Sequence, residues 1–247
     1  MMTPLDVIAM HGWGRDARTW DDWETATQAL GWRWQVGERG YGDLPPRVPL
    51  WPDSSHGARR LVMGRSLGPH LVSAEVLRKA DAVVLMASFA QFVPAGRSGR
   101  RVRAALAGMA GCLEDEAKAR TMLRTFLLKI ASPQSVDLLR AGPADGPLDE
   151  NNRMRLREDL ALLERCNGLP EGFPPDAKVL IVEAGQDQIV EPEARAMLRA
   201  ALPAADVINL PDAGHALLAG NVIERVVDWV ETWRREQEQR DHHSIAR

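Results

Sequence analysis

Short apolar runs, rich in β-branched residues, recur along the chain and end near glycine, proline or aspartate. They are continuous rather than alternating, which is typical of parallel strands covered on both faces. Segments with helical spacing separate them. This order predicts an α/β fold with a mostly parallel, doubly wound sheet. The predicted strands are 6–10, 32–36, 60–63, 82–86, 178–182 and 206–210, and the predicted helices of this unit are 16–30, 69–79, 191–202 and 220–237.

The segment 94–176 interrupts this rhythm. Its apolar residues follow helical spacing, and prolines and glycines punctuate it at 142–147 and 168–175. We interpret it as a helical lid inserted over the sheet. The core would then consist of 1–93 and 177–247, and we expect the polar end, roughly 234–247, to be frayed.

Composition excludes several classes of protein. The 247 residues are 45% hydrophobic and 26% charged, and the formal net charge of -3 gives no reason to expect nucleic-acid binding. Cys112 and Cys166 have no metal-ligand spacing, so we expect neither a disulfide framework nor a metal site. No secretory signal or membrane span is recognisable. These features favour a cytoplasmic protein.

The stretch Gly64-Arg-Ser-Leu-Gly68 is the first candidate for chemistry. A G-x-S-x-G pattern alone also arises by chance, and Ser66 would then be an ordinary turn residue. Here, however, the pattern follows a predicted strand and precedes a predicted helix. This is the context of a nucleophile elbow, in which a strained turn presents a serine to the substrate.

A nucleophilic serine needs a base, and the base needs an orienting acid. His215 follows the last predicted strand, and Asp187 follows the strand 178–182. The order Ser66, Asp187, His215 is the order expected for an elbow of this kind, with all three at the C-terminal ends of strands. Asp212 is the alternative acid, but its closeness to His215 in sequence makes the contact difficult.

The oxyanion of the reaction needs two backbone N–H donors. Leu67, directly after the serine, is one candidate. His11-Gly-Trp-Gly14 follows the first strand and offers Trp13 as the other, with His11 shaping the loop.

These motifs resemble those of the α/β-hydrolase superfamily and, within it, the carboxylesterases of biotin synthesis that hydrolyse pimeloyl-acyl-carrier-protein methyl ester. The matching residues are His11-Gly-Trp-Gly14 with Trp20, Gly64-x-Ser66-Leu67-Gly68, Gly185-x-Asp187 with Ile189-Val190, Ala213-Gly-His215-Ala216 and Leu123-Arg-Thr-Phe126-Leu127. The resemblance implies an α/β-hydrolase fold and ester hydrolysis without a cofactor. It also implies substrate contacts from Trp13 and from the lid residue Phe126.

The sequence departs from that family at two positions. Arg65 stands where the family usually has a tryptophan that contacts substrate, and Pro69 stands where it usually has glycine. We therefore expect Arg65 to contact substrate in a more cationic entrance.

The resemblance also implies an acidic acyl-carrier protein as partner, bound by lid arginines. The candidates here are Arg97, Arg100, Arg101, Arg103 and Arg124. A solvated helix face explains these arginines equally well. Two other functions stay open: a general short-acyl carboxylesterase or thioesterase acting on small-molecule esters, and a hydrolase-fold binding protein without activity.

Overall fold

A six-stranded parallel sheet forms the centre of the computed structural model, which describes residues 3–52 and 57–245. The strand order is β2-β1-β3-β4-β5-β6, and every neighbouring pair is parallel. The strands are β1 (Leu5–Met10), β2 (Trp32–Val36), β3 (Arg59–Arg65), β4 (Ala82–Met86), β5 (Lys178–Ala184) and β6 (Asp206–Leu210). This arrangement confirms the predicted fold class.

Alternate side chains of each strand enter different cores. In β1, Val7 and Ala9 pack on one face, where α1 (Asp21–Thr27) and α8 (Val222–Ile245) cover the sheet. Ile8 and Met10 pack on the other face, against α3 (Ala74–Arg78) and α7 (Pro192–Ala201). Burial on both faces explains why the strands read as continuous apolar runs.

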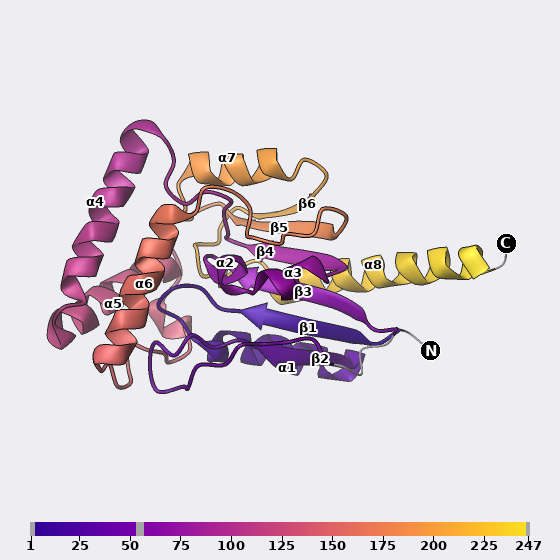
Figure 1. Cartoon of the computed structure of the whole chain (residues 1–247), viewed down its shortest axis with the longest axis horizontal. Helices are drawn as coiled ribbons and strands as arrows, with labels where there is room; N and C mark the ends of the chain where they lie inside the picture. Colours follow the sequence, from indigo (N-terminus) through magenta and orange to yellow (C-terminus); the bar gives the residue numbers. More distant parts are fainter. Residues whose placement is uncertain (1–2, 53–56, 246–247) are drawn as a thin grey trace.

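A third core lies under the helices between β4 and β5. These are α4 (Gly96–Cys112), α5 (Glu116–Ala131), the 3-10 turn η3 (Val136–Leu138) and α6 (Glu150–Arg165). Buried residues of these helices pack with Trp13, Leu67 and Phe89 from the ends of the strands. Figure 1 shows α4, α5 and α6 beyond the C-terminal ends of the strands, the position that a lid requires.

Three predicted helices differ in detail from the observed ones. The segment 16–30 divides into η1 (Ala17–Trp20), α1 and η2 (Gln28–Leu30). The segment 69–79 divides into α2 (Gly68–Leu71) and α3, because Val72 is extended and the Ser73 side chain caps the second helix. The frayed end predicted from residue 234 is wrong as far as the structure describes it, since α8 continues to Ile245.

The start of α8 is anchored by apolar burial, and its later part by polar contacts. Val226, Val230 and Trp233 are buried against the sheet. Arg234 then donates a hydrogen bond to the carbonyl oxygen of Thr3, and Glu238 accepts one from the Thr3 N–H. Sequence polarity alone does not reveal such contacts with the segment that precedes β1. Within the two described ranges, no helix is both long and apolar enough to span a membrane.

Adjacent strands offer a matched test of burial. Val182 on β5 is fully buried, whereas Val207 on the edge strand β6 is 48% exposed. We expect Val182→Ala to lower the free energy of unfolding by about 2 kcal/mol, because it removes buried methyl groups and leaves a cavity. Val207→Ala should cost less than about 1 kcal/mol. Urea denaturation of both variants checks this, and equal losses would contradict the assigned faces.

Candidate active site

Ser66 lies in a strained turn directly after β3. Its φ of 53° is in the left-handed region, which side chains other than glycine seldom adopt. The flanking glycines permit close approach: a Cβ at Gly64 would overlap the ring of Pro69, and a Cβ at Gly68 would overlap the carbonyl oxygen of Met10. The Ser66 N–H donates to the carbonyl oxygen of Met86, 2.9 Å away, which ties the turn to β4. These are the features of a nucleophile elbow.

The loop after β1 lies directly against this elbow. A Cβ at Gly12 would approach within 3.0 Å of the Ser66 Cβ. Within the described part of the chain, neither the Trp13 N–H nor the Leu67 N–H donates to a protein acceptor. Leu67 also precedes the first turn of α2. Two free N–H groups near the serine are the arrangement that an oxyanion hole requires.

The structure brings His215 and Asp187 together. The His215 Nδ1 lies 2.9 Å from Asp187 Oδ2, and both side chains are almost completely buried. The other carboxylate oxygen accepts N–H groups of Ile189 and Val190, at 2.8 and 3.0 Å. Burial alone would raise the pKa of Asp187. The charge and hydrogen bond of His215, with the two backbone N–H groups, hold that pKa below its ordinary value.

Asp212, the alternative acid, is exposed. Its carbonyl oxygen accepts a hydrogen bond from the Gln134 side chain. The glutamines beside Asp187 also bind other groups: Gln186 donates to the carbonyl oxygen of Pro211, and Gln188 donates to Ser132 Oγ. In this geometry Asp187 is the acid that contacts His215.

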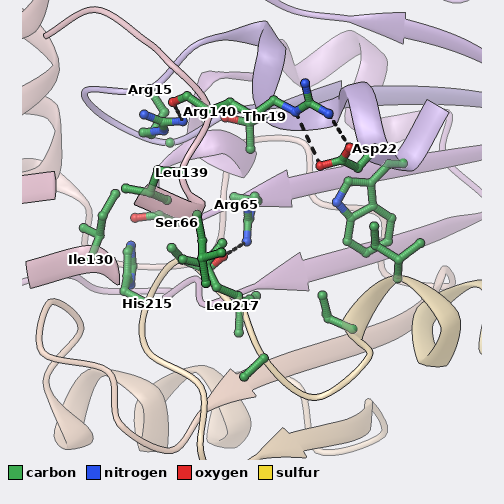
Figure 2. Close-up of a pocket in the computed structure, with 18 of the residues that line it drawn as sticks. Arg15, Thr19, Asp22, Arg65, Ser66, Ile130, Leu139, Arg140, His215 and Leu217 are labelled. Carbon is green, nitrogen blue, oxygen red and sulfur yellow. Dashed lines mark hydrogen bonds and ion pairs between the residues drawn. The ribbon is translucent and has the colours of Figure 1, made fainter. Parts of the chain in front are cut away.

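Two cavities meet at Ser66. The first, which we call the arginine cavity, has a volume of about 620 Å³ and is lined by Ser66, His215, Arg15 and Arg65 among others (Figure 2). The second, the lid cavity, has a volume of about 400 Å³ and runs beneath the helices between β4 and β5. Its apolar lining includes Phe92, Val102, Leu106, Met109, Met122, Phe126, Leu160 and Leu163.

Trp13 and Phe126 line both cavities. Their rings meet edge to face, with centroids 5.0 Å apart and planes at 85°. The Trp13 indole N–H donates to the carbonyl oxygen of Leu156 on α6, 2.8 Å away. The pair therefore lies at the division between the cavities, held by contacts with the lid helices α5 and α6.

Arg65 points into the arginine cavity, and its guanidinium donates to the carbonyl oxygen of Ala216 (Figure 2). Burial, and next the charge of Arg15, lower the pKa of Arg65 to about 10. Sequence reasoning did not single out Arg15. The available signal was its position, directly after the glycines of the loop that contains Trp13.

His11 is fully buried behind that loop, and it was predicted to shape it. Its Nδ1 donates to the carbonyl oxygen of Gly12, and its Nε2 accepts the Arg39 N–H. Arg39 also forms a bidentate ion pair with the buried Asp159 of α6. The Tyr41 hydroxyl donates a hydrogen bond to the same carboxylate. This network, which the sequence patterns did not indicate, connects the loop to the lid helix.

A family model described as the alpha/beta hydrolase family matches residues 6–229. The chain belongs to this family. Two similar solved structures are an esterase from Exiguobacterium antarcticum and the esterase RhEst1 from a Rhodococcus species. The first is 14% identical, with a TM-score of 0.69 over 95% of this chain and 93% of that one. The second is 16% identical, with a TM-score of 0.61 over 94% and 90%.

An enol-lactonase from Burkholderia xenovorans is similar in fold as well, with 16% identity and a TM-score of 0.62 over 93% of this chain and 90% of that one. No curated protein matches the sequence. At these identities the structures establish the α/β-hydrolase fold and not a substrate.

The remaining predicted residues of this α/β hydrolase lie on the lid surface. Arg97, Arg100, Arg101, Arg103 and Arg124 are all exposed on α4 and α5. Arg101 pairs with Glu191 and lies at the lid cavity, whose polar lining also includes Lys129 and Gln188. In the described residues, no group of three or more His, Cys, Asp or Glu side chains is placed to hold a metal ion.

The lowered pKa of Asp187 predicts pH-dependent stability for this hydrolase. An unfolded aspartate has a pKa of about 3.9. The stabilisation is thus fully present above that value and is lost as pH falls through the lower folded pKa. We expect Asp187→Asn to unfold at lower urea concentration than the wild type at about pH 6, with a gap that narrows towards about pH 3. The exposed Asp212→Asn variant is the control, and a gap that does not change with pH would disprove the linkage.

Proposed function

We propose that this chain is a serine carboxylesterase with Ser66, Asp187 and His215 as its catalytic triad. One observation carries the proposal: the strained Ser66 lines the same cavity as His215, and the Nδ1 atom of His215 contacts the buried carboxylate of Asp187. A serine hydroxyl is a weak nucleophile, and the histidine supplies the base that it needs.

The reaction follows from these roles. Ser66 Oγ attacks the ester carbonyl while His215 takes its proton, and the N–H groups of Trp13 and Leu67 bind the negative oxygen. The tetrahedral intermediate collapses, the C–O bond to the alcohol breaks, and His215 gives its proton to the leaving oxygen. Water then attacks the acyl-enzyme by the same steps and releases the carboxylic acid and free Ser66.

For the substrate, we propose the methyl ester of pimeloyl-acyl-carrier protein, as in biotin synthesis. The lid cavity supports this choice because it is mainly apolar, begins at Ser66 and extends to Arg101. A chain of methylene groups suits such a lining, and exposed arginines near its outer end suit an acidic carrier protein. A general short-acyl esterase or thioesterase would use the same triad.

Removal of the nucleophile tests the chemistry. We expect Ser66→Ala to lose about 10⁴-fold or more in kcat on a chromogenic ester, as for other serine triads. A fluorophosphonate probe should label the wild type and not this variant. Ser98→Ala is the matched control, because Ser98 on α4 hydrogen-bonds Glu193 of α7 and lines neither cavity at Ser66. A wild type that is not labelled and shows no turnover above that of Ser66→Ala would make a binding protein without activity the better interpretation, and full turnover by Ser66→Ala would exclude Ser66 as the nucleophile.

Genetic rescue tests the substrate. We expect the wild-type gene, and not its Ser66→Ala form, to restore growth of a biotin auxotroph that lacks its own esterase for this step. Purified protein should release methanol from pimeloyl-acyl-carrier-protein methyl ester. Rapid turnover of simple esters of rising chain length, without activity on the carrier-bound ester, would favour the general esterase.

Charge reversal tests the carrier surface. We expect Arg100→Glu combined with Arg103→Glu to raise KM several-fold for the carrier-bound ester, because both exposed cations face solvent where an acidic partner would dock. KM for a small chromogenic ester should stay the same, since neither residue lines a cavity at Ser66. Equal changes in KM for both substrates would contradict a role of α4 in binding the carrier protein.

A further inference from the structure

The arginine cavity contains buried donors without partners. Arg15 is only 8% exposed, and although its Nη2 donates to the carbonyl oxygen of Arg140, its Nη1 has no hydrogen-bond acceptor in the described residues. The buried hydroxyl of Thr19 also lacks a partner there. Figure 2 shows Arg15 and Thr19 across the cavity from Arg65, which lies beside Ser66.

Neither Arg15 nor Arg65 forms an ion pair with a carboxylate of the described chain, whereas Arg140 in the same cavity does. Arg140 pairs with Asp21 and Asp22. The cavity therefore contains cations of two kinds: Arg140, which carboxylates neutralise, and Arg15 and Arg65, which have no carboxylate partner in the described residues.

Nearby acidic groups are engaged elsewhere. Asp16 binds Arg18 and caps η1, and Asp145 accepts the Gly142 N–H. Asp22 is paired with Arg140, and Glu224 is exposed at the edge of the cavity. Burial, opposed in part by Asp16 and Asp145, lowers the pKa of Arg15, as burial does for Arg65. Buried cations without partners are costly, and a bound anion would offset that cost.

We propose that the arginine cavity binds a carboxylate group of the substrate, held by Arg65, Arg15 and the hydroxyl of Thr19. The preferred small substrates are therefore half-esters of dicarboxylic acids, with the scissile ester at Ser66 and the free carboxylate a few bonds away. Apolar side chains such as Ile130, Leu139 and Leu217 line the cavity as well and suit the intervening methylene groups. The inference rests on the proposed ester chemistry and is independent of a carrier protein.

Paired substrates measure the charge alone. The test compares the monomethyl esters of succinate, glutarate, adipate and pimelate with the corresponding dimethyl esters. We expect kcat/KM to be higher for the half-ester at one or more of these lengths. Arg65→Gln and Arg15→Gln should each lower the ratio of half-ester to diester about tenfold or more, the size of one charge-assisted hydrogen bond. Arg140→Gln, in the same cavity but already paired, should keep the wild-type ratio.

The outcomes separate the two proposals. Hydrolysis of diesters, with no preference for any half-ester or with a preference that both glutamine variants retain, would overturn the carboxylate site and leave the esterase intact. If no ester is hydrolysed, the proposed function fails, and calorimetry still tests the site: monomethyl glutarate should bind Ser66→Ala and bind its Arg65→Gln double variant about tenfold more weakly. Equal binding to both proteins would overturn the site independently of catalysis.

Discussion

The close approach of two loops at the ends of β1 and β3 is the constraint on which the site depends. β1 and β3 are parallel neighbours, with Met10 opposite Gly64, so the loops that follow the two strands leave the sheet at the same edge. The missing Cβ of Gly68 lets the elbow press against the Met10 carbonyl, and that of Gly12 lets the first loop reach Ser66. Only this proximity places the N–H groups of two loops beside one serine.

A second close approach connects the histidine loop to the lid. The Ala216 N–H donates to the carbonyl oxygen of Ile130 at the end of α5, 2.8 Å away. A Cβ at Gly214 would overlap the carbonyl oxygen of Ser132, so only glycine allows the two segments to meet. The position of His215 is consequently set by the lid as well as by the sheet. A change in the packing of α5 would therefore shift the position of His215 through this backbone hydrogen bond.

Sequence patterns predict the scaffold well because the scaffold follows local rules. Strands buried on both faces must be continuous and apolar, and parallel topology puts Ser66, Asp187 and His215 at one edge. The division of the helix after the elbow depends on Ser73, whose capping competes with a continuous helix. Arg15 was missed because burial of an arginine is decided by segments such as 140–142, distant in sequence, that enclose it.

At position 65, a substitution can change the substrate-facing surface without changing the turn that holds Ser66. The turn that holds Ser66 needs glycines at 64 and 68 but leaves the side chain at 65 free to vary, because that side chain faces the cavity rather than the core. The esterases of biotin synthesis, whose motifs this sequence resembles, usually carry tryptophan at this place. An arginine at this position is compatible with the same turn, and it gives the cavity a cationic wall in place of a neutral one. With Trp13 and Phe126 between them, the lid cavity then suits hydrocarbon and the arginine cavity suits charge. In the proposed function, the fold determines the reaction, and Arg65, whose side chain the fold does not constrain, determines where a carboxylate of the substrate would bind.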